Sequence, residues 1–299
     1  MTSPLGRVLT AMVTPMTPDG SLDLEATARL ATRLVDEGND GLVVNGTTGE
    51  AATTSDQEKD AIVRTVVEAV GDRASVMAGV GTNDTRHTIE VAAQAQAAGA
   101  DALLVVTPYY NKPPQEGLLA HFRAVADATE LPNVLYDIPS RSGVQIETET
   151  LLRLGEHPRI VAVKDAKADF WGATKVMAAT DLLWYSGNDA DNILYLSIGA
   201  TGFIGVTSHV ASRQYRRMLK AWESGRIADA QRVHRDLVPA VDAIMNITQG
   251  AIMTKAALVE LGVLDHATVR LPLTEATGEQ RAALALGLRE AGLSGTVAR

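Results

Sequence analysis

Lys164 stands where an amine can act as a nucleophile. It directly follows the apolar run from Ile160 to Val163, so the pattern places it at the end of a buried strand rather than on a solvated helix face. Loss of solvation destabilises an ammonium ion, lowers its pKa and supplies the neutral amine that Schiff-base chemistry requires. The alternative is a lysine that extends to solvent or pairs with Asp165. Taken alone, the residue leaves both interpretations open.

Other polar side chains also follow apolar runs. Tyr136 closes one such run, and a phenol there could relay protons, although a buried tyrosine with a satisfied hydroxyl group is the commoner arrangement. Thr47 and Thr48 lie in a glycine-flanked turn that offers hydroxyl and backbone N–H groups to an anion, but such turns are weakly specific. Arg141 could hold a carboxylate through two hydrogen bonds, or face solvent as most single arginines do.

Short apolar runs rich in β-branched residues recur, and a helical pattern follows each. Their starts lie about 20 to 35 residues apart, the length of a strand–helix unit. Most are apolar on both faces, as parallel strands covered by helices are. Eight units predict an α/β fold, a (β/α)8 TIM barrel, whose active sites form at the carboxyl ends of strands. The expected strands are Val8–Val13, Gly41–Asn45, Ser75–Gly79, Ala102–Thr107, Asn133–Ile138, Ile160–Lys164, Leu183–Ser186 and Gly202–Val206.

The segments between these runs carry helix signals. Ser55 and Glu58 have the spacing of a capping box, and Gly38 is placed to end the first helix. After residue 224 the alternation of strand and helix stops. The sequence therefore predicts a catalytic barrel over residues 1–224 and a C-terminal α-helical domain over residues 225–299. The helices expected in this second part are Ile227–Asn246, Ala251–Leu261 and Thr277–Ala291.

Composition narrows the class of protein. The 27 basic and 36 acidic residues give a net charge of −9, so no basic excess is available to neutralise nucleic-acid phosphates. The lack of cysteine excludes disulfides and thiolate nucleophiles, and the six histidines show no metal-ligand spacing. An open doubly wound sheet is the alternative fold, but the sequence has neither a G-x-G-x-x-G turn nor a P-loop, and no cofactor motif is present. No stretch is apolar enough to span a membrane, and a cytoplasmic protein is expected.

Taken in order, the polar strand ends resemble those of a known family of class I aldolases. The matching segments are residues 46–50 (GTTGE), 136–139 (YDIP) and 163–165 (VKD), and the resemblance runs over essentially the whole chain. The family is that of dihydrodipicolinate synthase and N-acetylneuraminate lyase. Residues 107–113 (TPYYNKP) and 138–143 (IPSRSG) are most similar to its synthase branch. The resemblance implies condensation of pyruvate with L-aspartate 4-semialdehyde, towards diaminopimelate and lysine, with no cofactor.

The resemblance also implies catalytic roles. Lys164 would form the imine with pyruvate, and the protonated imine would be the electron sink for loss of a methyl proton. Tyr136 would shuttle protons. Thr47 would link Tyr136 to Tyr110, which in the family enters the site from a neighbouring subunit. The active unit is then at least a homodimer, and members of the family are commonly homotetramers made of two such dimers.

Four further positions are implied to bind substrate. Thr48 would hold the pyruvate carboxylate, and Arg141 would bind the semialdehyde at the mouth of the site. Gly187 and Ile204 would line the pocket through their backbones.

Two positions depart from the family pattern. Asp137 stands where many members have asparagine, and Asp165 where many have glutamate, but neither change removes a catalytic group.

Two other functions stay open. One is an aldolase or lyase of the same family that uses a different aldehyde or 2-keto acid. The presence of Arg141, which would bind the semialdehyde, disfavours this function. The other is a non-catalytic barrel that binds a keto acid, which would be expected to have lost its lysine, tyrosine or threonine.

The resemblance finally implies an expectation about feedback by L-lysine. In sensitive members the effector lies at the dimer interface close to Tyr109. Asn83 is present here, but His87 replaces a glutamate that faces the lysine amino group, and Asp56 and Lys59 stand at helix positions that carry histidines in some sensitive enzymes. Weak or absent inhibition is expected, unless Asp56 turns inwards and replaces the lost charge.

Overall fold

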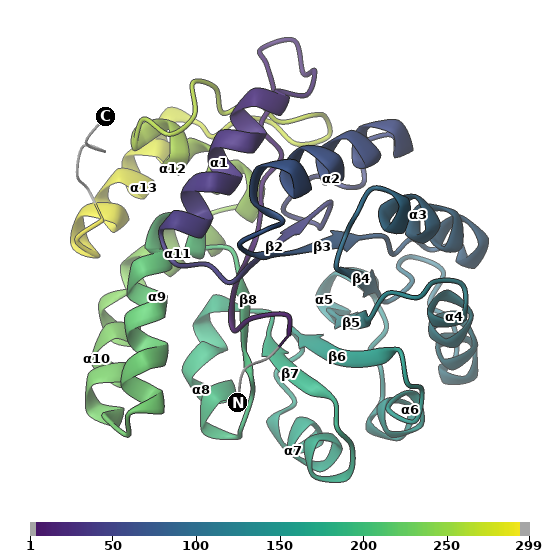
Figure 1. Ribbon diagram of the computed structural model, residues 1–299. Coiled ribbons are helices and arrows are strands. Elements are labelled where there is room, and N and C mark those ends of the chain that lie inside the picture. Colours follow the sequence, from purple (N-terminus) through teal and green to yellow (C-terminus); the bar gives the residue numbers. More distant parts are fainter. Residues whose placement is uncertain (1–3, 294–299) are drawn as a thin grey trace.

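The computed structural model describes residues 4–293. Its centre is a closed barrel of eight parallel strands in sequence order, in which β1 pairs with β8 (Figure 1). Every predicted strand is confirmed, with bounds that differ by no more than two residues, and the barrel replaces the doubly wound alternative. The strands are β1 Val8–Ala11, β2 Gly41–Val44, β3 Ser75–Gly79, β4 Ala102–Val106, β5 Asn133–Asp137, β6 Ile160–Asp165, β7 Leu183–Ser186 and β8 Gly202–Gly205.

Helices cover the outside of the barrel between successive strands. The predicted capping box opens α2, where Ser55 and Glu58 exchange side-chain and backbone hydrogen bonds, and Gly38 follows α1 with a φ of +105°. A short helix, α5, directly follows β5, and a 3-10 turn, Asp189–Asp191, follows β7. The barrel helices are α1 Leu24–Asp36, α2 Asp56–Val70, α3 Thr85–Ala97, α4 Gln115–Asp127, α5 Pro139–Ser142, α6 Thr148–Leu154, α7 Phe170–Ala179, α8 Asn192–Ser197 and α9 Ser208–Glu223.

Alternate residues of each strand point to opposite sides of the barrel wall, and this decides which polar side chains reach the interior. In β5, Tyr136 belongs to the apolar cluster inside the barrel, whereas Leu135 packs outwards beneath the helices. In β6, Ala162 is an interior residue. Lys164, two residues later, therefore points inwards as well, and its neighbour Asp165 points outwards.

The chain beyond Ser224 forms α10 Ile227–Asp236, α11 Val238–Met245, α12 Gly250–Glu260 and α13 Gly278–Glu290. The prediction of a single helix over Ile227–Asn246 is wrong, because the chain changes helix at Leu237. Pro239 stands in the first turn of α11, where its missing N–H is tolerated; within a continuous helix it would break the hydrogen-bond ladder.

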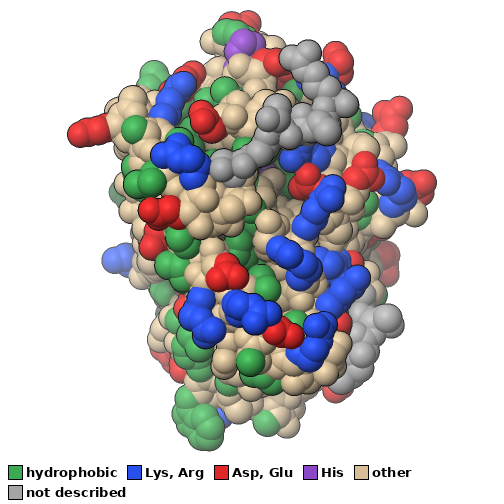
Figure 2. Space-filling view, turned by 90° about the vertical axis from the view of Figure 1, so that its left-hand side faces the viewer, with side chains coloured by type: hydrophobic (Ala, Val, Ile, Leu, Met, Phe, Trp, Pro, Cys, Tyr) green, Lys and Arg blue, Asp and Glu red, His purple; other side chains and the backbone are tan. Residues whose placement is uncertain are grey.

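The tail helices pack onto the barrel. α10 contacts α9, and Ile252 and Leu284 of α12 and α13 belong to the same apolar cluster as the barrel interior. The outer surface on this side mixes basic and acidic side chains (Figure 2), and Asp229 of α10 pairs with both Arg226 and Arg232. Whether the tail is a domain of its own stays a prediction. Within residues 4–293, none of the helices has both the length and the apolar character needed to cross a bilayer.

Candidate active site

Lys164 and Tyr136 lie side by side at the carboxyl ends of β6 and β5, where they are partners in the strand register. Both side chains point into the barrel and are almost inaccessible, at 4% and 6% exposure. The Nζ atom of Lys164 lies 4.2 Å from the centroid of the Tyr136 ring. The candidate amine nucleophile and the candidate proton relay are therefore adjacent.

Burial has the largest effect on the ionisation of Lys164. It lowers the pKa of the amino group from 10.5 to about 8; the Asp189 carboxylate opposes this shift, and the positive charge of Arg141 adds to it. One oxygen of Asp189 accepts the backbone N–H groups of Val206 and Thr207, at 2.8 and 3.0 Å, which holds the carboxylate in place. Near neutral pH, a larger share of Lys164 is therefore the neutral amine than for a lysine in water. No motif in the sequence marks Asp189 as a site residue.

The alternative interpretation of Lys164 is wrong. Asp165 does not pair with it, because its carboxylate lies on the outer side of the barrel wall. There it accepts the backbone N–H of Lys167 at 2.8 Å and the indole N–H of Trp184 at 3.2 Å. Nor does Lys164 extend to solvent, given its burial.

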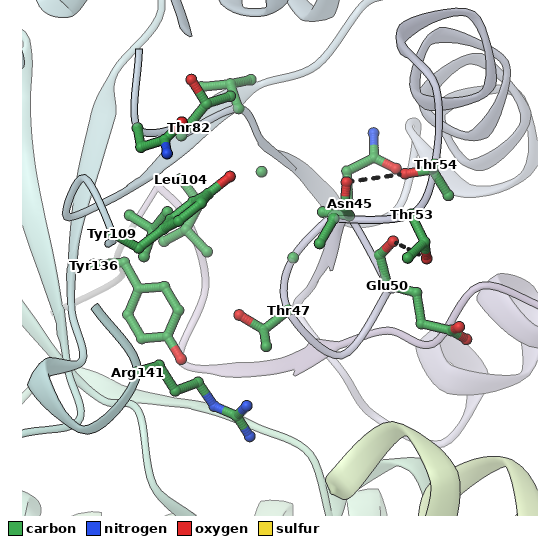
Figure 3. A pocket seen from close by; sticks show the side chains of 18 of the residues that line it. Asn45, Thr47, Glu50, Thr53, Thr54, Thr82, Leu104, Tyr109, Tyr136 and Arg141 are labelled. Atoms are coloured by element: carbon green, nitrogen blue, oxygen red, sulfur yellow. Dashed lines mark hydrogen bonds between the residues drawn. The ribbon is translucent and has the colours of Figure 1, made fainter. Parts of the chain in front are cut away.

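Tyr136 is a neutral phenol at physiological pH. Burial raises its pKa to about 12, while the charge of Arg141 and a hydrogen bond with Thr47 act in the opposite direction. Figure 3 shows the Thr47 and Tyr136 side chains turned towards the same space, with the Arg141 guanidinium near the phenol oxygen. A phenol beside a hydroxyl group can accept one proton while it donates its own, as a proton relay requires.

The turn that carries Thr47 and Thr48 is held by a buried ion pair. Glu50, at the end of this turn, lies 2.5 Å from the Nζ of Lys255 in α12 and accepts the backbone N–H of Arg270 at 2.9 Å. The side chains of Glu50 and Lys255 are 1% and 0% exposed, so solvent does not screen their attraction. The C-terminal helices thus anchor one wall of the candidate site.

A cavity of about 230 Å³ opens beside Lys164 at this end of the barrel. Among its described lining residues, the only charged side chains are Lys164 and Arg141, so the cavity favours an anionic ligand such as a carboxylate. A side chain at Gly187 would narrow it, because its Cβ would lie 3.1 Å from the Cγ of Lys164. The predicted site residues that line it are Thr47, Thr48, Tyr136, Arg141, Lys164 and Gly187.

A larger cavity of about 640 Å³ adjoins the first and shares Thr47, Tyr136 and Arg141 with it. Its outer part reaches Tyr109 and Tyr110. Tyr110 is 88% exposed, and its φ of +74° lies in the left-handed region that side chains rarely adopt. Within one chain, the structure thus places Tyr110 in solvent at the mouth of the site rather than beside the buried Tyr136.

Two findings concern the rest of the cavity lining, and the expected backbone role of Ile204 stays a prediction. Ile204 is fully buried in β8, and Val206, two residues further along, lines the smaller cavity. Asn246 and Gln249, between α11 and α12, and Gly250, the first residue of α12, also line it and were not predicted from the sequence. Their only signal was a polar break between two apolar helices, which does not say what that break faces.

Comparisons with known proteins agree with this arrangement. The Dihydrodipicolinate synthetase family matches residues 4–291. The 4-hydroxy-tetrahydrodipicolinate synthase of Kineococcus radiotolerans is 58% identical over 291 residues, which cover 97% of this chain and 94% of the relative. The structure of DHDPS from Cyanidioschyzon merolae with lysine bound has a TM-score of 0.94 at 38% identity and covers 97% of this chain and 99% of that chain. A monomeric dihydrodipicolinate synthase variant has a TM-score of 0.92 at 36% identity, over 96% of this chain and 97% of that one. With matches of this extent in sequence and in structure, the chain belongs to the dihydrodipicolinate synthetase family.

Proposed function

We propose that this chain condenses pyruvate with L-aspartate 4-semialdehyde to 4-hydroxy-tetrahydrodipicolinate, in the biosynthesis of diaminopimelate and lysine. The observation that carries the proposal is a buried lysine with a lowered pKa, beside a neutral tyrosine, in a cavity whose charged side chains are both cationic. The relative that is 58% identical carries the name of this activity. The cytoplasmic location expected from the sequence stays part of the proposal.

In the proposed reaction, the neutral amine of Lys164 adds to the keto carbon of pyruvate and expels water through a carbinolamine. Tyr136 transfers the protons that this dehydration needs. The protonated imine accepts the electron pair left when a methyl proton departs, and the resulting enamine attacks the aldehyde carbon of the semialdehyde. The amino group of the added unit then displaces Lys164 and closes the ring. Thr48 and Arg141 would hold the two carboxylates.

The direct test is the initial rate with pyruvate and L-aspartate 4-semialdehyde, coupled to a dihydrodipicolinate reductase. Pyruvate with aldehydes that lack the carboxylate is the matched comparison, because Arg141 should favour the carboxylate-bearing substrate. Turnover of another aldehyde in preference to the semialdehyde would instead identify a different aldolase of the family. No turnover, together with tight pyruvate binding, would indicate a non-catalytic barrel.

We further propose that the active unit is at least a homodimer, with the tetramer of two dimers as the form to which the family resemblance points. The support is Tyr110, whose side chain is exposed on a backbone of positive φ at the cavity mouth, where a partner chain could take it up as a relay member. One structural relative is a monomeric dihydrodipicolinate synthase variant, so the oligomeric state of this chain has to be measured.

Subunit complementation should reveal the contribution of Tyr110. Lys164→Arg and Tyr110→Ala chains should each be nearly inactive alone, and co-expression should restore about a quarter of the wild-type activity, because half of the dimers are mixed and each has one complete site. The measurement is activity per chain after co-purification. Absence of recovery in confirmed mixed dimers would rule out the partner's tyrosine.

Inhibition by L-lysine is expected to be weak or absent. His87 occupies the position where the family resemblance calls for a glutamate, and its Nε2 lies 2.8 Å from a carboxylate oxygen of Asp56. Lys59 approaches the same carboxylate at 3.6 Å. Asp56 is thus engaged by two partners, which leaves it poorly placed to face the amino group of an effector. A lost charge-assisted hydrogen bond costs about 1.5–3 kcal/mol, or roughly one to two orders of magnitude in affinity.

The measurement is the initial rate against L-lysine at subsaturating pyruvate. His87→Glu is the matched variant and should increase sensitivity by about tenfold or more, since it returns a carboxylate to this position. Half-inhibition of the wild-type protein by submillimolar L-lysine would contradict the prediction.

A further inference from the structure

A buried ion pair lies on the outer side of the barrel wall, directly behind Tyr136 and Lys164. The side chains of Asp137 and Lys167 are 1% and 5% exposed, and the Lys167 Nζ lies 3.0 Å from Asp137 Oδ2. Removing two charges from water is costly unless further hydrogen bonds complete the geometry. The groups that form these further hydrogen bonds with Asp137 and Lys167 therefore indicate what the ion pair does.

The pair holds both polar backbone groups of a single residue, Ile146. The N–H of Ile146 points between the two carboxylate oxygens of Asp137, at 3.2 Å from each, and its carbonyl accepts a hydrogen bond from Lys167 Nζ at 2.8 Å. The chain leaves the barrel wall after Asp137 and returns to it at Ile146, which is fully buried. The ion pair consequently closes the base of the intervening segment, residues 138–145, together with Gln115, whose side-chain amide donates to the Gln145 carbonyl at 2.9 Å.

This segment carries Arg141, the guanidinium that lines the cavity. Its interior is held by local hydrogen bonds: the N–H groups of Arg141 and Ser142 donate to the Ile138 carbonyl at 3.0 and 2.9 Å, and Gly143 reverses the chain with a φ of +78°. A long bond of 3.4 Å joins it to the backbone of Tyr110. A segment that is ordered internally but attached at its base moves as a unit if the base shifts.

We propose that Asp137 and Lys167 are positioning residues for the aldehyde substrate: by holding Ile146, they set where Arg141 lies at the cavity mouth and thereby the affinity for the semialdehyde carboxylate. The inference rests on the proposed function, in which Arg141 binds that carboxylate. The pyruvate site is formed by Lys164 and the turn after β2, which lie on other segments. Loss of the pair should therefore affect one substrate and spare the other.

Asp137→Asn tests this directly, because it preserves the shape of the side chain and an acceptor for the Ile146 N–H but removes the carboxylate that pairs with the Lys167 ammonium, whose remaining acidic neighbour is Asp165. The KM for the semialdehyde should rise about 10-fold, part of the worth of a charge-assisted hydrogen bond. The KM for pyruvate and the borohydride trapping of the pyruvate imine should stay within about twofold. Asp60→Asn is the control, since it breaks an exposed pair with Arg64 on α2 and should change neither KM.

A second variant keeps the inference testable if Asp137→Asn does not fold. Burial already raises the pKa of Asp137 to about 6 against the effect of Lys167, so without that ammonium the carboxyl group can be accommodated as the neutral acid. Lys167→Met should accordingly fold and show the same selective rise in the KM for the semialdehyde. Lys167→Arg, which retains a cation and its donors, should restore most of the wild-type affinity.

A double-mutant cycle with Arg141→Ala separates the possible outcomes. Arg141→Ala alone should raise the KM for the semialdehyde, and adding Asp137→Asn to it should change that KM by less than about twofold, because the pair acts through Arg141. Effects that multiply, or an equal rise in both KM values, would overturn the positioning role and leave the proposed function intact. An unchanged KM in Arg141→Ala would instead count against the proposed function, and this inference would fall with it.

Discussion

Lys164→Arg is expected to lower kcat/KM by at least about 10³-fold, because a guanidinium keeps the positive charge but cannot form an imine. Lys164→Met, which removes the charge at similar length, should be equally inactive. Borohydride reduction in the presence of pyruvate should add a stable pyruvyl mass to the peptide that contains Lys164 in the wild-type protein and to no peptide of either variant.

The pH dependence of imine formation gives an independent check on the same residue. Burial lowers the pKa of Lys164 to about 8, and only the unprotonated amine adds to a ketone. The rate of trapping should therefore rise by about tenfold per pH unit below pH 8 and level off above it. For a lysine with an ordinary pKa of 10.5, the rate of trapping would still rise with pH above pH 8 and would not level off there.

Lys175→Met provides the control for both measurements. Lys175 is an exposed lysine on α7 that stacks over Trp171, and its loss should leave trapping and turnover unchanged. Labelling of the peptide with Lys112 or Lys167 in place of the Lys164 peptide would show that the imine lysine has been assigned wrongly.

Tyr136→Phe should lower kcat by about 10²-fold to 10⁴-fold, the usual worth of a positioned acid–base group. The KM for pyruvate should change much less, because the relay acts in the transition state rather than in ground-state binding. With a pKa of about 12, the phenol is protonated before each transfer, so its loss removes a donor and not a charge. Steady-state kinetics with the coupled assay measures both parameters.

Two companion variants sharpen this second prediction. Thr47→Val should also lower kcat, and the double variant should be little worse than Tyr136→Phe, since both hydroxyl groups belong to one relay. Tyr185→Phe is the matched control: this buried tyrosine is a register partner of Lys164, but its hydroxyl group donates to the carbonyl of Gly6, which precedes β1 at the amino ends of the strands, so kcat should be unaffected. A wild-type kcat for Tyr136→Phe would refute the relay.

Much of the barrel could be predicted from local sequence. Each strand is a short apolar run covered on its outer side by helices, and burial on both faces produces that run wherever the strand lies in the barrel. Helix ends could also be predicted from local sequence, as the capping box at Ser55 and the glycine at position 38 show. The exception was the tail, where Pro239 fits the first turn of a new helix but the apolar pattern alone did not reveal the break.

The sequence by itself determined which residues could do the chemistry: an amine after an apolar run at Lys164, a phenol at Tyr136 and the hydroxyl group of Thr47. Only the tertiary structure decided how they meet. The direction of a strand side chain depends on the register of the closed barrel, which placed Lys164 beside Tyr136 inside the wall and Asp165 outside it. The walls of the cavity come from segments that are far apart in the chain. The reason is that the elements that cover the mouth of the barrel are determined by tertiary packing and not by their order in the sequence. For that reason, Asn246, Gln249 and Gly250 of the tail line the site, although the polar break in the local sequence did not predict what they would face.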